Sequence, residues 1–554
     1  MGSSEEGEGE GEGSHLMDEH EKPPSRQAGM PRAVPMAGLA VLVLVAWFSY
    51  GGSAPEKSTL RVATWNIAAI NNNPFEYWIT HDDADYNALM EGVQSFIDQP
   101  GERDVPVSEV FTPAMWAELK ALMTTQGWGG VEETEAMWQA SFGQRKIISG
   151  FMKDRSLGEK RLASMPDRVT NTINLAGGRG VANRPTVINC FAGDMTSSVR
   201  WWANWKAFMF ETKVLVEGGG AATLPASLLQ PIKRAKYPAL TVEEETISIP
   251  LQTLCQAIFD AILVYIVNIV SPSGKWQQLQ QQMCDSLNRK KDANTLAILD
   301  SHYSDINVFF VQEAAAVFVA KANAVSLGKT YSVISSSSLD GKRDQNSLIL
   351  ICKQYFDPAS VREHTAEVMA TFDKATPVAN GDLLVISAVD VFGRSYLLAS
   401  FHGDTNGLAT LPVLAAVHAL ARRKPSHRLV FGLDANTYAH GSASKQGVVE
   451  FGQDFVSKGY SSCWGDAPDP TNHTTFNART FLQPQLQKAA KSTEKASKGD
   501  KNPKDFILFP KAAYSVVATT KDNTGRRRYT EGMVFPTLQF PSDHGLVATV
   551  LREL

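Results

Sequence analysis

Two hydrophobic patterns alternate along the chain. In one stretch near residue 60 and again after about residue 305, apolar and β-branched residues form short runs bounded by turn residues, as in "TLRVATWN" and "INVFFVQEA", which is typical of strands. Between about residues 84 and 305, apolar residues recur three and four positions apart, as in "DYNALMEGVQSFIDQ" and "PAMWAELKALMTTQ". This spacing predicts helices. A strand-rich region is therefore interrupted by a long helical one.

The strand-rich region after residue 305 contains few helices. "YSVISSSSLDGKRDQNSLILICKQYF" and "GDLLVISAVDVFGRSYLLASFHGD" each predict two strands around a turn, and "HRLVFGLDANT", "KDFILFP" and "GLVATVL" predict further strands. "LPVLAAVHALARR" has the spacing of an amphipathic helix. Many strands with few crossover helices predict an α+β sandwich.

Two apolar features of the helical region invite competing interpretations. "FDAILVYIVNIV" is about 12 residues long, and a bilayer span needs about 20, so we expect a core helix. "RWWANWKAFMF" carries an aromatic stripe that would suit base stacking, but such stripes more often belong to a core, and we expect a core here.

The N-terminus predicts a targeting segment. Residues 1–34 are acidic and of low complexity at first and then basic, so we expect disorder. Residues 35–54 contain an apolar run followed by small residues, typical of a signal peptide, with an uncleaved membrane anchor or a buried core helix as alternatives. We therefore expect the protein to be secreted, organellar or anchored in a membrane, with membrane contact through residues 35–50.

Composition and cysteine usage narrow the class. The 554 residues are 43% hydrophobic and 20% charged with a net charge of -5, which is ordinary for a globular protein and excludes a globally basic coat for nucleic acid. The five cysteines are odd in number, widely spaced and without a CxxC motif. Buried free thiols are therefore expected rather than a disulfide framework or a zinc site.

Polar side chains stand at one end of six predicted strands. Each alone is typical of a turn residue, but all six would meet at one rim if the strands share a core. Carboxylate and amide oxygens are the ligands that Mg²⁺ prefers, and histidines can donate protons. The set is Asn66, Glu313, His402, Asp434 with Asn436, Asp505, and Asp543 with His544.

The ordered motifs "TWN", "QE", "SFHGDTNG", "GLDANT", "KDFILF" and "SDH" resemble the endonuclease/exonuclease/phosphatase superfamily, the deoxyribonuclease-I-like proteins. The resemblance covers residues 57–75 and 300–554. It implies a four-layered α/β sandwich, in which two packed β-sheets are flanked by helices. Residues 76–299 would then be a mainly helical insertion, whose end helices replace the connecting helix of the family.

The resemblance also implies a metal site. Glu313 would be the main ligand of Mg²⁺, with Mn²⁺ or Ca²⁺ as alternatives. Asn66 would lie beside it and hold metal or phosphate, and Asp543 would be a further metal ligand.

The remaining motif residues would take catalytic roles by the same resemblance. Asp434 would orient or deprotonate the attacking water, and Asn436 would bind a phosphate oxygen. His544, oriented by Asp505, would contact the scissile phosphate. His402 matches the second histidine of the nuclease-like branch and would protonate the leaving oxygen. The family pairs that histidine with an acid that the motifs here do not locate.

Phosphodiester hydrolysis needs charge neutralisation and an in-line water, which these residue types supply. Basic clusters near the predicted site strands, including Lys342 with Arg343 and the segment 488–504, favour a nucleic-acid substrate, although solvated surface lysines are the alternative. Asn477 and Arg479 are further candidates for substrate contact. We expect a nuclease acting on DNA or RNA. The alternatives are a membrane-associated phosphatase or phosphodiesterase acting on inositol phosphates or phospholipids, and a catalytically silent binding module.

Overall fold

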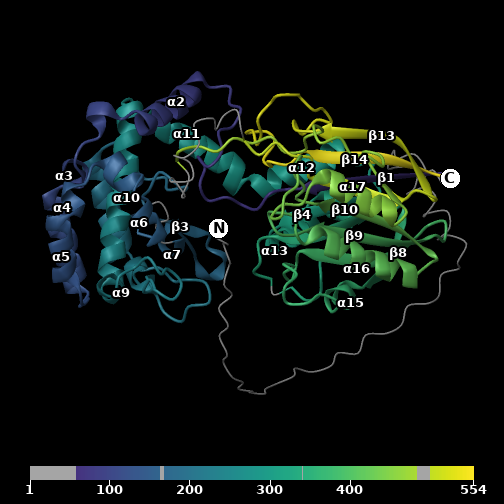
Figure 1. The fold of residues 1–554 in the computed structure, drawn as a ribbon, viewed down its shortest axis with the longest axis horizontal. Helices are drawn as coiled ribbons and strands as arrows, with labels where there is room; N and C mark the ends of the chain where they lie inside the picture. The colour runs from purple at the N-terminus through teal and green to yellow at the C-terminus, as the bar shows by residue number, and fades with distance from the viewer. Residues whose placement is uncertain (1–57, 163–167, 340, 483–498) are drawn as a thin grey trace, which may run out of the picture. The chain divides into compact units, whose positions relative to one another are not determined.

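Two six-stranded sheets make up the strand-rich part of the chain (Figure 1). A computed structural model describes residues 58–162, 168–339, 341–482 and 499–554, so the predicted leader (1–34) and apolar segment (35–54) lie outside the described residues. The mixture of sheets and helices confirms the predicted α+β class. Residues 56–554 form one compact unit.

The first sheet has the order β13-β14-β1-β4-β6-β5, and the second has the order β11-β12-β10-β9-β8-β7. Strands β1 and β4 pair in parallel, as do β9 and β10, whereas the other neighbours are antiparallel. The first sheet comprises β1 (Thr59–Asn66), β4 (Val308–Ala314), β5 (Tyr331–Ile334), β6 (Asn346–Cys352), β13 (Tyr514–Asp522) and β14 (Leu546–Glu553). The second comprises β7 (Phe356–Glu363), β8 (Leu383–Asp390), β9 (Ser395–His402), β10 (His427–Asp434), β11 (Tyr460–Ser462) and β12 (Asp505–Pro510).

The two sheets pack face to face around one apolar core. Residues of β1, β4 and β6 share this core with residues of β8, β9 and β10. At the closest approach, a Cβ atom on Gly432 of β10 would lie 2.3 Å from the ring of Phe310 in β4, so only glycine allows the strands to come this near.

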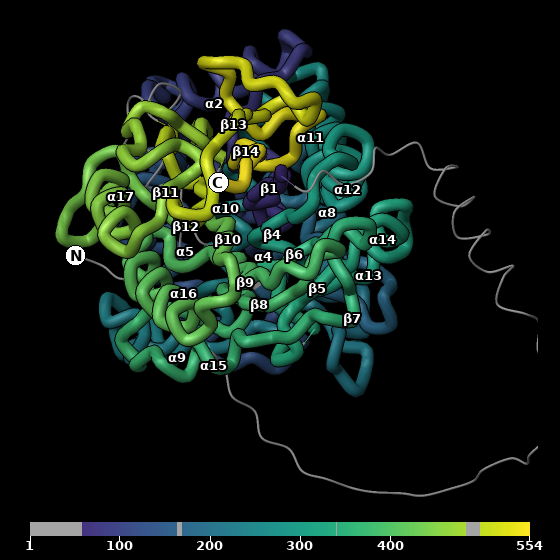
Figure 2. The backbone as a smooth tube through the Cα atoms, turned by 90° about the vertical axis from the view of Figure 1, so that its right-hand side faces the viewer, coloured from purple at the N-terminus to yellow at the C-terminus, as the bar shows by residue number. Residues whose placement is uncertain are grey.

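Helices cover the outer faces of the sheets. Helices α12 (Lys291–His302) and α13 (Ala316–Ala324) pack on the first sheet, and α16 (Thr410–Arg423) and α17 (Val448–Ser457) pack on the second. Figure 2 shows the two sets on opposite sides of the strands. The short helices α14 (Ser326–Thr330) and α15 (Thr365–Met369) complete this part.

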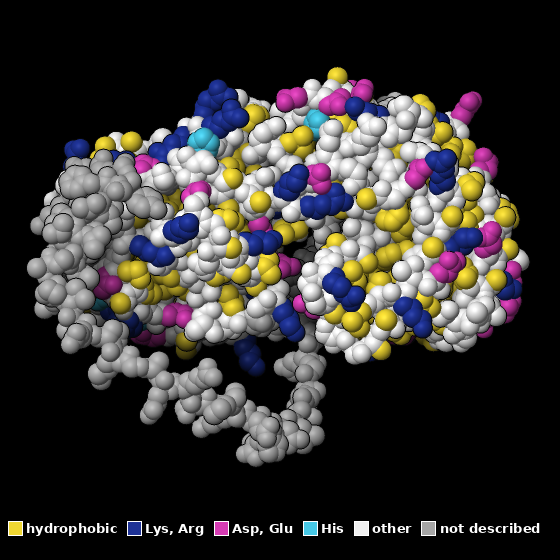
Figure 3. Space-filling view, turned by 180° about the vertical axis from the view of Figure 1, so that it is seen from behind, with side chains coloured by type: hydrophobic (Ala, Val, Ile, Leu, Met, Phe, Trp, Pro, Cys, Tyr) yellow, Lys and Arg dark blue, Asp and Glu magenta, His cyan; other side chains and the backbone are white. Residues whose placement is uncertain are grey.

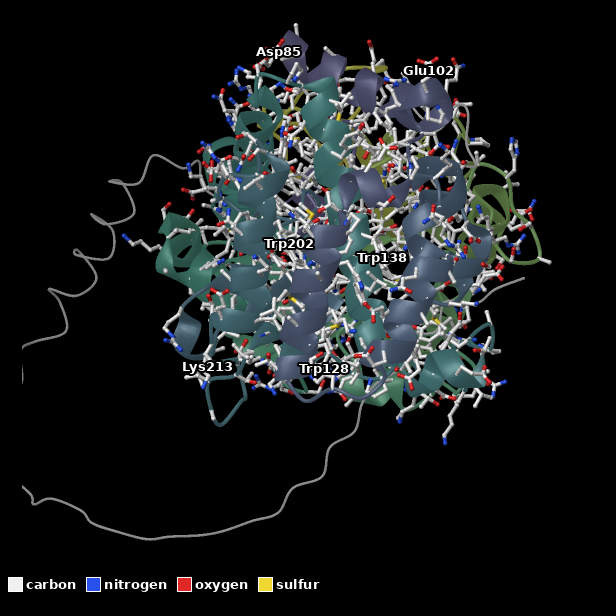
Figure 4. The ribbon with its side chains drawn as sticks, turned by 90° about the vertical axis from the view of Figure 1, so that its left-hand side faces the viewer. Asp85, Glu102, Trp128, Trp138, Trp202 and Lys213 are labelled. Atoms are coloured by element: carbon white, nitrogen blue, oxygen red, sulfur yellow. A yellow bond between two sulfur atoms is a disulfide. The ribbon has the colours of Figure 1, made fainter. Side chains whose placement is uncertain are left out.

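The predicted helical region has an apolar core of its own, built around α10 (Ser248–Val270). The other helices are α2 (Ala84–Asp98), α3 (Val107–Val110), α4 (Pro113–Thr125), α5 (Val131–Ala140), α6 (Arg155–Glu159), α7 (Arg168–Asn171), α8 (Ser198–Lys206), α9 (Val242–Thr246) and α11 (Lys275–Cys284), with a small ribbon of β2 (Thr172–Asn174) and β3 (Val181–Asn183). Trp138 and Trp202 lie among these helices (Figure 4). Trp201 and Trp205 are fully buried, which confirms that the aromatic stripe belongs to a core.

One of two expectations about this region needs correction. The apolar segment of about 12 residues lies within the 23-residue helix α10, and among the described residues α10 is the one helix long and apolar enough to cross a membrane. Its most apolar window is 78% buried by the rest of the chain, as in a core helix. The expectation of free thiols is wrong for two cysteines, because Cys190 and Cys284 form a disulfide, whereas Cys255, Cys352 and Cys463 are free and buried.

Candidate active site

Strand direction brings the polar strand ends of the first sheet together. Because β1 and β4 are parallel, Asn66 and Glu313 leave the sheet at the same edge. Strand β14 is antiparallel to β1 and therefore begins at this edge, so His544, two residues before it, lies there as well. The indole of Trp65 donates a hydrogen bond to the carbonyl of His544 (2.9 Å) and fixes this approach.

The second sheet contributes its polar ends by the same logic. His402 and Asp434 are opposite each other in the parallel register of β9 and β10. Asp505 opens β12, which is antiparallel to β10, and it also lies opposite Asp434. Since the sheets pack face to face, the ends of five strands and the residue before a sixth meet in one place.

A buried amide joins the two sheets at this rim. The Nδ2 atom of Asn66 donates to Glu313 Oε1 (3.0 Å) and to Asp434 Oδ2 (2.9 Å). The backbone N–H of Ala69 donates to the other oxygen of Glu313 (2.7 Å). Glu313 has a φ of +55°, a left-handed conformation that costs energy for a residue with a side chain and is often found at functional sites.

His544 is held by two carboxylates. Its Nδ1 atom lies 3.0 Å from Asp505 Oδ2, and its Nε2 atom lies 3.6 Å from Asp434 Oδ2. Burial by itself would lower the pKa of His544, but the charges of Asp505 and Asp434 outweigh it and raise the pKa to about 10. The ring is therefore an imidazolium at neutral pH and presents a donor toward Asp434. Burial raises the pKa of Asp434, yet the charges of His544 and His402 bring it below its ordinary value.

His402 lies against two acids of the motif set and next to a third, Asp382, that the motifs did not locate. Its Nε2 atom lies 3.3 Å from Glu313 Oε1 and 3.6 Å from Asp434 Oδ2. Its backbone N–H donates to the carbonyl of Asp382 (3.0 Å), whose carboxylate pairs with Arg343. His402 thus belongs to the same cluster as the carboxylates of both sheets.

Lys504 ends the basic segment 488–504, but its side chain lies inside the cluster. Its ammonium donates to Asn436 Oδ1 (3.1 Å) and to Asp500 Oδ2 (2.8 Å), and the side chain is 5% exposed. Because an ammonium can only donate, the atom facing it must be the amide oxygen of Asn436. Asn436 Nδ2 is consequently turned away, is buried, and has no partner among the described residues. It is a donor available to a ligand.

Asp543 lies in a neighbouring group. Its Oδ2 atom accepts from the hydroxyl of Tyr77 (3.0 Å) and from Nδ2 of Asn477 (3.2 Å). Arg479 stacks on the ring of Tyr77, 4.4 Å from its centroid. Among the described residues, no hydrogen bond or ion pair joins Asp543 to Glu313.

A buried lysine from the helical region supports both groups. Lys291 of α12 donates to the carbonyls of Ala69 (3.3 Å) and Pro541 (2.9 Å). Ala69 follows Asn66 in its loop, and Pro541 precedes Asp543 in the other. Burial lowers the pKa of Lys291 to about 8 although the charges of Asp543 and Glu313 oppose this. No local sequence signal connects Lys291 to the motifs, because α12 is distant in sequence from both loops.

The other predicted basic contacts are dispersed. Lys342 is exposed, Arg343 pairs with Asp382, and Arg527 pairs with Asp305. Residues 488–498 of the lysine-rich segment lie outside the described residues. On the face seen in Figure 3, Lys and Arg side chains form separate groups among Asp and Glu.

The donor set fits a hard divalent cation. The carboxylates of Glu313 and Asp434 approach the same amide of Asn66, and among the described residues neither forms an ion pair with Lys or Arg. The hard oxygens of Glu313 and Asp434 suit Mg²⁺, although the charge of Asp434 is partly balanced by the imidazolium of His544. Ligand atoms of Asp434, Asp505 and His544 also lie within 4.8 Å of one another. However, a protonated imidazole has no lone pair for a metal, so Glu313 is the better candidate. Asn66 turns its NH₂ group toward Glu313 and Asp434, and its Oδ1 atom accepts from the N–H of Ala68 (2.9 Å), so its amide would have to turn before Asn66 could act as a ligand.

Comparisons with known proteins give distant likenesses. A family model described as "Domain of unknown function (DUF8234)" matches residues 104–281, within the helical region. Similar solved structures include TDP2 of D. rerio with a single-strand DNA product (13% identity, 48% of this chain and 95% of that one, TM-score 0.32). The human nocturnin catalytic domain is 11% identical, with 48% of this chain and 87% of that one covered and a TM-score of 0.31. An endonuclease/exonuclease/phosphatase from Bacteroides vulgatus is 12% identical, with 49% of this chain and 94% of that one covered and a TM-score of 0.32. No curated protein matches the chain. Scores at this level do not identify a reaction or a substrate.

Proposed function

We propose that this protein is a divalent-metal-dependent phosphodiester hydrolase with the four-layered sandwich of the endonuclease/exonuclease/phosphatase superfamily, interrupted by a helical insertion at residues 76–299. One observation carries the proposal: residues at or next to the ends of six strands of two sheets form one connected cluster, namely Asn66, Glu313, His402, Asp434, Asp505 and His544. Turn residues at unrelated strand ends would not converge in this way.

In the proposed site, Glu313 holds the cation, which we take to be Mg²⁺ with Mn²⁺ or Ca²⁺ as alternatives. Asn66 would join it as a ligand through Oδ1 only if its amide turned away from the N–H of Ala68. When bound, the cation would supply Lewis acidity worth several kcal/mol. Asp543 would be a further ligand only if it exchanged its bonds with Tyr77 and Asn477. The amide of Asn66 keeps Glu313 and Asp434 aligned with each other.

The protein's own groups supply the rest of the chemistry. Asp434 accepts the proton of the attacking water, and the free Nδ2 of Asn436 donates to a phosphate oxygen. His544, kept protonated by Asp505, places a positive donor beside the phosphate. His402 donates to the leaving oxygen. Positioned acids and bases of this kind contribute about 10²–10⁴-fold each.

We propose nucleic acid, DNA or RNA, as the substrate. Two cations lie close to the cluster. Arg479 stacks on Tyr77 beside Asp543 and pairs with Glu76, and Arg343 pairs with Asp382, whose carbonyl accepts from the backbone N–H of His402. The phosphates of a polyanionic strand would replace these carboxylates as partners of the two arginines. Inositol phosphates and phospholipids are the competing substrates, with the apolar segment 35–54 in their favour.

The test compares hydrolysis of plasmid DNA, single-stranded RNA, inositol phosphates and sphingomyelin, with Mg²⁺ and with chelator. We expect metal-dependent cleavage of a nucleic acid. Glu313→Gln should lower kcat by roughly 10²-fold or more, since it removes a charged metal ligand. Glu217→Gln, an exposed glutamate of the helical region, is the matched control and should leave kcat unchanged. Full activity of Glu313→Gln would refute the metal assignment, and intact substrates in every reaction would refute the hydrolase.

A further inference from the structure

A second site lies in the helical region. A cavity of about 300 Å³ opens between residues 161–162, which follow α6, the segment 230–237 and α10. None of the candidate active-site residues lines it. The volume is at the lower end of the range for small-ligand sites.

The cavity has a polar floor with an unmet acceptor. Gln256 of α10 is 2% exposed, and its Nε2 atom donates to Thr170 Oγ1 (3.0 Å). Its Oε1 atom is buried and has no partner among the described residues. A buried acceptor without a donor costs roughly 1–3 kcal/mol, so a ligand that donates to it gains affinity.

The floor is rigid because a buried network holds it. Thr170 Oγ1 also accepts from Arg184 (2.8 Å), and Arg184 forms a fully buried ion pair with Asp260 (2.7 Å). The indole of Trp205 donates to the same carboxylate (3.0 Å). Such a network keeps the Gln256 amide in one orientation without a ligand.

The mouth of the cavity is cationic. Arg161, Lys233 and Lys236 line it, and none of them forms an ion pair among the described residues. The adjacent Lys160, by contrast, is neutralised by Glu244 (2.8 Å). Arg161 donates to the hydroxyl of Tyr237 (2.5 Å), so the guanidinium and the aromatic ring are fixed beside each other.

We propose that this cavity binds a mononucleotide. The phosphate would pair with Arg161, Lys233 and Lys236, the base would pack on Tyr237, and a donor on the base would reach Gln256 Oε1. A free mononucleotide and the terminal nucleotide of a strand share this chemistry. The site stands on its own geometry and does not depend on the hydrolase.

Calorimetric titration of the full chain with adenosine 5′-monophosphate, in chelator, tests the proposal. Purine riboside 5′-monophosphate lacks the amino donor, inorganic phosphate lacks the base, and a 5′-phosphorylated dinucleotide represents a strand end. We expect saturable binding of adenosine 5′-monophosphate and roughly tenfold weaker binding of the first two probes. If the dinucleotide binds as tightly as adenosine 5′-monophosphate, the site accepts the end of a strand. If the dinucleotide binds more weakly, the site is specific for free nucleotides.

Variants separate this cavity from other binding. The double variant Lys233→Gln/Lys236→Gln and the single variant Gln256→Leu should each weaken binding roughly tenfold or more. Lys146→Gln/Lys213→Gln removes two exposed lysines that do not line the cavity and should bind normally; Figure 4 labels Lys213. If Gln256→Leu fails to fold, the lysine pair decides. No binding by the wild type, or unchanged binding by the cavity double variant, overturns the proposal.

Discussion

At the scale of single residues, the orientation of one amide defines the chemistry of the site. Lys504 donates to the amide oxygen of Asn436, so Asn436 presents its NH₂ group rather than its oxygen to a ligand. A donor suits a phosphate oxygen, whereas an acceptor would repel it. Lys504 is therefore a positioning residue that acts through Asn436.

This relation predicts non-additive kinetics. Asn436→Ala should lower kcat roughly 10²-fold, as loss of one donor to a developing charge does. Lys504→Met should lower kcat by roughly tenfold or more because the amide can then rotate. The double variant should be little worse than Asn436→Ala, since Lys504 has no amide left to orient. Steady-state kinetics of the four proteins measures the coupling.

The control for this cycle is Lys501→Met. Lys501 lies over the ring of Phe476 (3.8 Å) instead of bonding to Asn436, so its loss should leave kcat unchanged. Strictly additive effects of Lys504→Met and Asn436→Ala would show that Lys504 acts independently of the amide.

His544 predicts a pH dependence. Its pKa of about 10 in the folded state exceeds that of a free histidine, about 6.5, so folding gains stability from protonation. This contribution is fully present below about pH 6.5 and is lost as pH rises toward about 10. An NMR titration of the imidazole signals, with His544→Gln for assignment, should show one ring that titrates far above the others. A midpoint near 6.5 for His544 would contradict its pairing with Asp505.

At the scale of elements, strand direction determines the site. The short apolar runs of β1, β4, β9 and β10 were visible in the sequence, and so were their polar ends. The patterns did not predict β7 and β13, because most of their residues are exposed or half-buried and no apolar run marks them.

The motifs could not predict contacts between residues that are far apart in the sequence, and the reason is physical. Lys291 braces loops near residues 69 and 541 only because α12 packs on the first sheet. Likewise, folding places Asp382 beside Arg343, a pairing that no motif indicates. Periodicity and motif order report on local structure, and neither contains information on which distant loops a side chain reaches.

The crossing of β4 and β10 predicts the effect of one methyl group. In Gly432→Ala, the new Cβ would meet the Phe310 ring at 2.3 Å, so the two sheets must separate locally. Overpacking of this kind costs about 1–3 kcal/mol. Urea denaturation of Gly432→Ala should show this loss in the free energy of unfolding. Gly129→Ala, where a Cβ meets nothing within 4 Å, is the control and should be near neutral or stabilising.

At the scale of the whole molecule, two cores depend on each other. The helical core contains Phe481 and Leu482 from the C-terminal part of the chain, and Lys291 joins the helical region to the site loops. These contacts indicate that the helical region stabilises the candidate active site, and the same region contains the second cavity. The contacts argue against removing residues 76–299 as a test of function, because the site loops would lose a buried brace.

The disulfide gives the last prediction. Cys190 and Cys284 close a loop with a sequence separation of 94, and a cross-link of that length stabilises a fold by up to about 4–5 kcal/mol in the chain-entropy model. A reductant should therefore lower the Tm of the wild type, and Cys190→Ser/Cys284→Ser should have the same low Tm with or without reductant. Peptide mapping without reduction should recover the linked pair from protein made in an oxidising compartment.

The same experiment bears on location. Disulfides persist in the secretory pathway and outside cells but are rare in the cytosol. We propose that the apolar segment 35–54 directs the chain to such a compartment, where the helical core would fold with its cross-link in place. If the wild-type protein were recovered after secretion with Cys190 and Cys284 as free thiols and with a Tm that does not respond to reductant, the disulfide itself would be contradicted. If the chain stayed in a reducing compartment, the proposed role of segment 35–54 would be contradicted instead.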